Sequence, residues 1–546
     1  MSVAKQNRTA ENRMTMAAGG FALGGVLLFI GLAAGSLLAQ STGGNDAGPF
    51  LDAYIWRITR FTLLQAGLST LFSVLLAIPV ARALARQASF PGRIWMLRLL
   101  ALPLGLPALV GALGLIEIWG RQGLLNRVLA AAGLEQPVSI YGLSGILIAH
   151  VFFNMPLAAR LMLAGIERIP AEYWRTSANL GMSAFAIFRF IEWPVIRGLL
   201  PGIAGLVFML CATSFTLVLT LGGGPAASTI EVAIYQALRF DFDPPRAIAL
   251  AALQVALTGA LLLVLKLIAP PPPEGETSGK SIRRSDGASS LSRLADRVWL
   301  VLAAGLVGLP FAAIAYAGSK ADLFRLLSEP VFHRALAMSA TISVLSAVIS
   351  VAVTALMIRT ESLALAQRRP GMTARFFAGA IGASTSFILL IPPVVLGAGW
   401  FLLLRPFGDV ARFAPAVVVA INALMALPFV HRVLAPAMAT HAVRTGRLAA
   451  SLGIAGFQRL LWIDWPGLRK PLFVAFSFAM ALSLGDLGAV ALFGSQDMVT
   501  LPYLLYSRMG SYRTADAAGL ALFLGLLCLV LTVLGTAGEE PEGKGA

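Results

Sequence analysis

The residues that stand out as able to bind or react are a few polar groups inside long apolar stretches. Asp486, within Leu482-Ser-Leu-Gly-Asp-Leu-Gly488, is the most prominent and is expected about midway along its helix. Ser214 stands at the matching position of an internal repeat. An ionisable group surrounded by apolar sequence is a candidate for a functional role, such as attracting a cation. A structural role has equal weight, because Asp486 could cap a helix that breaks beside Gly485 and Gly488.

Other polar residues in apolar stretches fit packing better than catalysis. Glu117 is expected near the end of its segment, and His150 is expected to be a packed, hydrogen-bonded side chain beside Asn154. We place Asn154 with Ser214 and Asp486 on a tentative substrate pathway. The histidines and the two cysteines, Cys211 and Cys528, show no metal-binding spacing. We therefore predict no catalytic residue, no metal and no cofactor.

One stretch imitates a nucleotide-binding motif. The sequence Gly275-Glu-Thr-Ser-Gly-Lys-Ser281 is one residue shorter than the phosphate-binding loop G-x-x-x-x-G-K-S, and no apolar strand precedes it. We therefore expect no ATPase site within this chain.

The composition indicates a membrane protein. The chain has 546 residues, of which 58% are hydrophobic and 12% charged, and its mean hydropathy is +0.81. Apolar segments long enough to cross a bilayer as helices predict an all-α polytopic protein with about twelve transmembrane helices. These segments begin near Phe21, Phe61, Leu97, Leu143, Gly198, Ala247, Val298, Ala335, Phe377, Ala414, Leu472 and Ala517.

The positive charge predicts the topology. A net charge of +16 could suggest a nucleic-acid partner. However, the basic residues gather in alternate loops, as the positive-inside rule describes. We therefore predict no nucleic-acid partner and cytoplasmic N- and C-termini. The loops that we place inside span residues 82–98, 166–197, 266–297, 359–375 and 431–470.

The chain repeats itself. Residues 1–269 and 296–546 are predicted to be two halves of six spans each, joined by a Pro-, Gly- and Ser-rich cytoplasmic linker over 270–295. Matched pairs include Pro107 with Pro392 and Gly114 with Gly399. Because six spans is an even number, both halves should have the same orientation in the membrane.

The most distinctive repeat is a polar loop motif. Each copy has Leu-Gly, an aromatic residue four positions after the glycine, and Ile-acid-Trp-Pro. Pro170 and Gly181 predict a short helix–turn–helix over 169–186, and Trp193-Pro194 predicts re-entry into the membrane. Such a loop could dock on a soluble motor, or could be a plain amphipathic surface loop. The residues that we assign to docking are Glu172, Arg175, Leu180, Gly181, Phe185, Arg447, Leu452, Gly453 and Phe457.

This motif resembles the cytoplasmic signature of ABC importer permeases, which reads Glu-Ala-Ala, then Gly, then Ile-x-Leu-Pro. The chain departs from it with Arg175 and Arg447 in place of Glu, and with Trp193 and Trp465 in place of Leu. Most of the chain more closely resembles the fused permeases of thiamine and thiamine-pyrophosphate importers of Gram-negative bacteria. The stretches that carry this resemblance are Trp119–Gly123, Tyr141–Pro156, Leu221–Pro225, Glu231–Leu238 and Gly510–Arg513.

The resemblance implies two tandem type I importer permease domains in the inner membrane. It also implies two copies of an ABC ATPase subunit, a periplasmic substrate-binding protein and membrane lipid as partners. Thiamine is a cation, so an acid such as Asp486 facing the pathway is chemically reasonable. The alternatives are the same architecture importing ferric iron or another small solute, an ion-driven secondary transporter, which should carry paired intramembrane charges, and a membrane-embedded enzyme.

Overall fold

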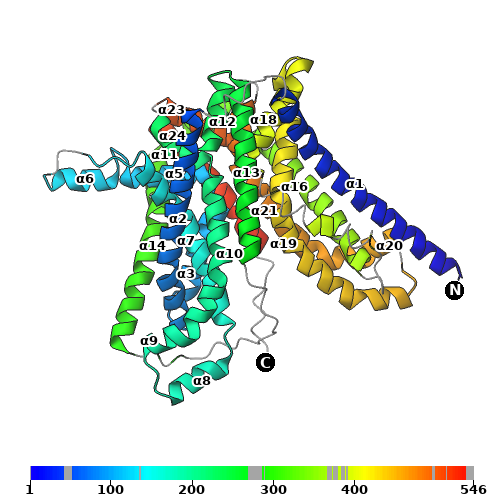
Figure 1. The fold of residues 1–546 in the computed structure, drawn as a ribbon, viewed down its shortest axis with the longest axis horizontal. Coiled ribbons are helices and arrows are strands. Elements are labelled where there is room, and N and C mark those ends of the chain that lie inside the picture. Colours follow the sequence, from blue (N-terminus) through cyan, green and yellow to red (C-terminus); the bar gives the residue numbers. More distant parts are fainter. Residues whose placement is uncertain are drawn as a thin grey trace. The chain divides into compact units, whose positions relative to one another are not determined.

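The described part of this computed structural model is built of helices joined by short turns (Figure 1). It covers residues 2–41, 52–133, 137–268, 284, 286–287, 289–365, 372, 379–382, 388, 391–454, 456–494, 498–511 and 513–536. Within these ranges no β-strand occurs, and eleven helices are long and apolar enough to cross a membrane. The predicted all-helical, polytopic class is therefore confirmed.

The chain forms two compact units, which we describe separately. Unit 1 comprises residues 1–46, 234–249 and 323–546, and unit 2 comprises residues 47–233 and 250–322. The helices α12 (Ile230–Arg239) and α13 (Pro244–Ile268) are divided between the two.

Unit 2 is organised around α2, which packs against α7, α10 and α14. One face of α2 carries small buried polar residues at helical spacing, which allow close approach between helices in an apolar medium. Gln65 donates a hydrogen bond to the carbonyl oxygen of Cys211 on α10 (2.9 Å), and Ser69 hydrogen-bonds His150 on α7 (2.9 Å). The helices of unit 2 are α2 (Ala53–Arg86), α3 (Arg93–Leu99), α4 (Leu102–Gly105), α5 (Ala108–Trp119), α6 (Leu124–Ala131), α7 (Leu143–Glu167), α8 (Ala171–Asn179), α9 (Ala184–Ile187), η2 (Phe188–Glu192), α10 (Trp193–Ala212), α11 (Thr216–Leu221), η3 (Pro225–Ala227) and α14 (Ser290–Ser319).

Unit 1 repeats this plan around α16, which packs against α19 and α21. The Ser339 hydroxyl accepts a hydrogen bond from the Leu501 amide (2.8 Å), just as the Thr62 hydroxyl accepts one from the Ile230 amide (3.1 Å) in unit 2. The sequence repeat therefore corresponds to a repeated contact. The helices of unit 1 are α1 (Ser2–Ser41), α15 (Leu323–Ser328), α16 (Pro330–Leu365), α18 (Pro393–Leu404), η4 (Arg405–Phe407), η5 (Val410–Arg412), α19 (Ala414–Ser451), α20 (Gly456–Arg459), η6 (Leu460–Asp464), α21 (Trp465–Gly485), α22 (Gly488–Phe493), α23 (Leu501–Gly510) and α24 (Thr514–Thr536).

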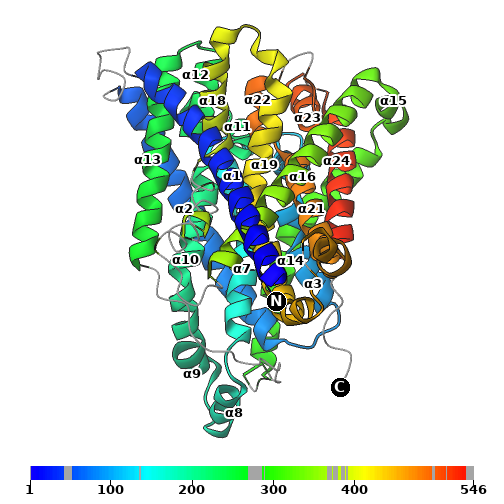
Figure 2. The same ribbon diagram turned by 90° about the vertical axis from the view of Figure 1, so that its right-hand side faces the viewer.

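Helix α1 belongs to unit 1, where it lies along α16 and α18 (Figure 2). The Ser36 hydroxyl donates a hydrogen bond to the Gly399 carbonyl oxygen (2.7 Å), and the rings of Phe29 and Trp400 stack with centroids 4.7 Å apart. A Cβ at Gly399 would lie 2.5 Å from the Ala33 carbonyl oxygen, so only glycine allows this approach.

Helix α14 belongs to unit 2, where it packs against α5 and α2. A Cβ at Gly114 would lie 2.7 Å from the carbonyl oxygen of Pro310 on α14. Gly114 and Gly399 match in the repeat, and each lies against the backbone of another helix, α14 at Gly114 and α1 at Gly399. Each compact unit contains the opening helix of the other sequence half, so the units and the predicted halves divide the chain differently.

Two predicted spans differ from the structure. The stretch beginning near Leu97 is broken into α3 and α4, because Pro103 and Pro107 interrupt the helix, and the apolar segment that follows covers Ala108–Ala131. The span expected from Phe377 lies largely outside the described residues, and a short apolar helix, Pro393–Phe407, follows it.

Candidate functional site

The first candidate site is the loop that joins α7 to α10, which we call the first loop (residues 168–193). Pro170 precedes α8, Gly181 turns the chain with φ +59°, and the Ser183 hydroxyl caps α9 by accepting a hydrogen bond from the Ala186 amide (3.2 Å). The predicted helix–turn–helix is confirmed. Figure 1 shows α8 and α9 at the lower end of unit 2, beyond α10.

The first loop leaves large apolar side chains in the open. Leu180 is 71% exposed, Phe185 70% and Phe190 67%. Glu172 and Arg175 are exposed on α8 beside them. Exposed apolar groups gathered on one loop and rimmed by charges are typical of a surface that binds another protein. A Cβ at Gly181 would meet no atom of the described residues within 4 Å.

The second loop (residues 441–465) differs in its helices. Helix α19 runs unbroken from the membrane segment to Ser451, because Ala442 stands where the first loop has Pro170. Leu452 is exposed, and Gly453 turns the chain with φ +67°. Arg447 lies in α19 and Phe457 in α20, while their side chains lie outside the description. Both loops therefore share the glycine turn but not the separate helix.

Sequence reasoning missed the role of the motif's acid. Glu192 and Asp464 each end a short π-helix that leads directly into the Trp-Pro start of a long helix. Glu192 pairs with Arg82 on α2 (2.6 Å), and Asp464 pairs with Arg359 on α16 (3.3 Å). The signal was present in the sequence, because both an acid and a basic residue recur at matching positions.

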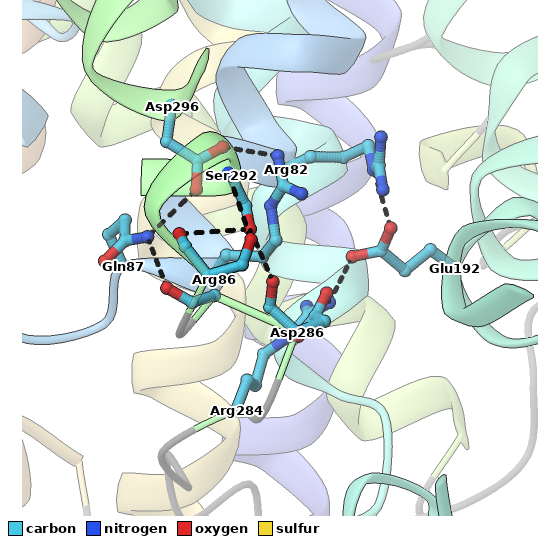
Figure 3. Close-up of polar contacts among 10 residues, drawn as sticks. Arg82, Arg86, Gln87, Glu192, Arg284, Asp286, Ser292 and Asp296 are labelled. Atoms are coloured by element: carbon cyan, nitrogen blue, oxygen red, sulfur yellow. Dashed lines mark hydrogen bonds and ion pairs between the residues drawn. The ribbon is translucent and has the colours of Figure 1, made fainter. Parts of the chain in front are cut away.

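Glu192 belongs to a larger buried cluster in unit 2 (Figure 3). Three arginines and three carboxylates balance one another in it, which meets the requirement that buried charges be paired. The pairs are Arg82 with Glu192, Arg284 with Asp286 and Glu192, and Arg86 with Asp296. The cluster joins α2, η2, α14 and the end of the predicted linker.

The structure corrects the place of Asp486. It lies not midway along a membrane helix but at the break between α21 and α22. Its carboxylate accepts hydrogen bonds from the amides of Gly488 and Ala489, each 3.2 Å long, and so caps α22. The capping alternative therefore describes its contacts, and a part in transport stays a prediction.

The other pathway candidates lie in unit 2. Ser214 occupies the break between α10 and α11, which matches the break at Asp486 in the repeat. Asn154 is buried on α7, and its amide donates a hydrogen bond to the Cys211 sulfur (3.3 Å). The hydrogen bond of His150 agrees with the packing role predicted for it. Among the described side chains, no three metal-ligating groups cluster.

The phosphate-loop imitation at 275–281 lies outside the described residues. The helical membrane fold and the repeated glycine-turn loop define the class of this protein, a polytopic permease of the ABC importer type. Comparison with characterised chains identifies the family more closely.

The chain is 51% identical over 538 residues to the thiamine transport system permease protein ThiP of Brucella suis biovar 1, a match that covers 97% of this chain and 96% of that one. The protein of the same name from Escherichia coli K12 is 44% identical over 481 residues, 88% of each chain. That from Haemophilus influenzae is 39% identical over 508 residues, 93% of each. No protein-family model matches. The chain belongs to the family of thiamine transport system permease proteins.

A more distant relative matches in part. The molybdenum transport system permease protein ModB of Mycobacterium bovis is 32% identical over 203 residues, which is 36% of this chain and 74% of the relative. This match therefore covers only part of the present chain.

Proposed function

We propose that this chain is the membrane subunit of an ATP-driven importer that moves thiamine or thiamine pyrophosphate across the bacterial inner membrane. The cargo is supported by the names of relatives that match nearly the whole chain. The predicted halves, 1–269 and 296–546, would form the pathway together, and both termini would lie in the cytoplasm.

The observation that carries the proposal is the first loop. Its exposed Leu180 and Phe185 flank a glycine turn, and α7 and α10 hold the loop at both ends. An apolar surface attached to two membrane-crossing helices can pass the motion of a soluble partner into the membrane. The second loop offers Leu452 and Gly453 in the same way.

The partners follow from this arrangement. Two loops would bind two copies of an ATPase subunit on the cytoplasmic side, and a periplasmic binding protein would deliver the cargo. Docking is assigned to Glu172, Arg175, Leu180, Gly181, Phe185, Arg447, Leu452, Gly453 and Phe457. Asp486, Ser214 and Asn154 are assigned to the pathway.

Reconstitution in liposomes tests the proposal. The chain with its ATPase and binding protein should take up radiolabelled thiamine when ATP is present on the ATPase side. The purified chain alone should hydrolyse no ATP, because hydrolysis belongs to the partner. ATP turnover by the isolated chain would contradict the permease assignment. Uptake of ferric iron instead of thiamine would contradict the proposed cargo and leave the permease assignment in place.

A further inference from the structure

The two loops neutralise their buried acid with different parts of the chain. In unit 1, Asp464 is surrounded by Arg359 on α16 (3.3 Å), His441 on α19 (3.1 Å) and Arg459 on α20 (3.6 Å). His441 and Arg459 belong to the second loop itself, whereas Arg359 comes from α16. Asp464 is therefore neutralised by α16 together with two side chains of the second loop itself.

The first loop lacks the corresponding residues. At the offset that aligns Gly181 with Gly453, Ile169 replaces His441 and Ile187 replaces Arg459. Both isoleucines are buried and apolar. Glu192 keeps Arg82, the counterpart of Arg359, but the first loop supplies no further cation to its carboxylate.

Arg284 supplies the missing cation from the linker. Its guanidinium is 2.6 Å from Glu192 and 2.8 Å from Asp286, and the Arg284 side chain is only 4% exposed. The same guanidinium lies over the ring of Trp174, 3.9 Å from the ring centre. Trp174 belongs to α8, so one side chain reaches both the helix of the first loop and the acid at the loop's end.

The charge of Arg284 is secure at physiological pH. Burial lowers its pKa, but hydrogen bonds to Asp286 and attraction to Glu192 more than offset this and leave the pKa above its usual value. A planar guanidinium can pair with two carboxylates at its edges while it stacks on an aromatic ring, which an ammonium group cannot do as well.

The residues around Arg284 are anchored to membrane helices. The Ser292 hydroxyl on α14 donates a hydrogen bond to the Asp286 carbonyl oxygen (3.0 Å). The Gln87 side chain, just past α2, donates to the carboxylate of Asp296 on α14 (3.0 Å), which also pairs with Arg86 (Figure 3). Asp286 is thereby connected to α14, and Gly287 is connected to the end of α2, because the Gln87 side chain also donates a hydrogen bond to the Gly287 carbonyl oxygen (3.4 Å).

We propose that Arg284, Asp286 and Gly287 form a strap that fastens α8 to the membrane helices of unit 2, with Arg284 as its positioning residue. The predicted linker is then more than a tether between two halves. The strap holds α8 rigidly enough for motion received by the first loop to reach α2, α10 and α14. This inference rests on the proposed function, because coupling has meaning only if α8 receives an ATPase.

The test uses the double variant Arg284→Gln/Asp286→Asn in the full chain, reconstituted with the ATPase and binding protein. The double change removes one positive and one negative charge together, so the remaining buried charges still pair. Arg297→Gln is the matched control, because Arg297 lies nearby on α14 and is exposed. The measurement is thiamine taken up per ATP hydrolysed, together with ATPase retained on purification.

The double variant should accumulate in the membrane but lose about tenfold in uptake per ATP, as expected when the stack of Arg284 on Trp174 of α8 and its charge-assisted pairing with Glu192 are both lost. The control should match the wild type. Wild-type uptake per ATP in the double variant would overturn the strap, because α8 would then be positioned without it.

A second variant covers the case in which the double variant fails to accumulate. Arg284→Lys keeps the positive charge but loses the planar guanidinium that pairs with two carboxylates and stacks on Trp174. This variant should accumulate and still take up less thiamine per ATP than the wild type. Equal uptake per ATP would overturn the proposal. Failure of the proposed function is recognised separately, because the ATPase would then not purify with the wild-type chain either.

Discussion

At the residue scale, substitutions at the two glycine turns can distinguish backbone strain within a loop from contact between the loop and a partner. Gly181 and Gly453 have φ of +59° and +67°, and a Cβ on either would meet no atom within 4 Å in the part of the chain that the structure describes. A side chain there costs about 1–2 kcal/mol for the left-handed backbone. An effect larger than this backbone cost indicates contact with another molecule, because the first side-chain carbon has open space beside the described residues.

We expect Gly181→Leu or Gly453→Leu to leave membrane insertion intact, to lower uptake severalfold and to weaken retention of the ATPase. Gly181→Asn is the matched variant, because asparagine tolerates the left-handed conformation. Subunit co-purification and thiamine uptake measure both effects. Full uptake with both glycines replaced by leucine would contradict the docking role of the turns.

Asp486 allows charge to be tested apart from structure. Its carboxylate caps α22, and asparagine is as good a cap as aspartate. Asp486→Asn should therefore preserve the fold and the ATPase complex while lowering thiamine uptake, if the negative charge attracts the cation. Asp486→Ala should in addition lose about 1 kcal/mol of capping. Normal uptake by Asp486→Asn would leave Asp486 with its capping role alone.

At the element scale, the two loops differ through one proline. Pro170 cannot donate a backbone hydrogen bond, so α7 ends before it and α8 forms a separate helix, whereas α19 continues through Ala442. A separate helix needs its own attachment, and the contact of Arg284 with Trp174 on α8 provides one. A continuous helix is held by its own backbone hydrogen bonds.

We expect Pro170→Ala to favour continuation of α7 into α8 and to lower uptake severalfold without loss of protein from the membrane. The reciprocal change, Ala442→Pro, should break α19 at a cost of about 3 kcal/mol. Uptake normalised to membrane-inserted protein is the measurement. If Pro170→Ala transports like the wild type, the independent placement of α8 is not required for coupling.

At the scale of the whole molecule, the pattern of basic loops predicts which ends of the helices face the cytoplasm. Asp241, Ser511 and Leu180 are all exposed, and the native Cys211 and Cys528 are buried. Accessibility of an introduced cysteine to a membrane-impermeant reagent therefore depends only on the side of the membrane.

In intact cells whose outer membrane admits the reagent, Asp241→Cys and Ser511→Cys should be labelled from outside. Leu180→Cys should be labelled only after the inner membrane is opened. Labelling of Leu180→Cys in intact cells would reverse the predicted orientation and place the first loop away from any cytoplasmic ATPase.

The sequence alone determined the membrane helices and the turns of the first loop, because both depend on local chemistry. Long apolar segments are sufficient to predict membrane helices, because each must satisfy its own backbone hydrogen bonds in lipid. Pro170, Gly181 and Trp193-Pro194 predicted the first loop, because their preferences act within a few residues. The helix breaks at Asp486 and in the stretch after Leu97 were harder to place, since capping and proline effects compete with strong hydrophobicity.

The tertiary structure decided which residues that are far apart in the sequence come into contact. The chain offers many arginines, and only the fold shows that Arg82 and Arg284 meet at Glu192. Only the fold shows that α1 and α14 each complete the compact unit of the other sequence half, because apolar helices of similar composition have no local signal for their neighbours. Which helices pack together depends on small differences in how closely they can approach. Gly114 and Gly399 allow such an approach because they have no Cβ.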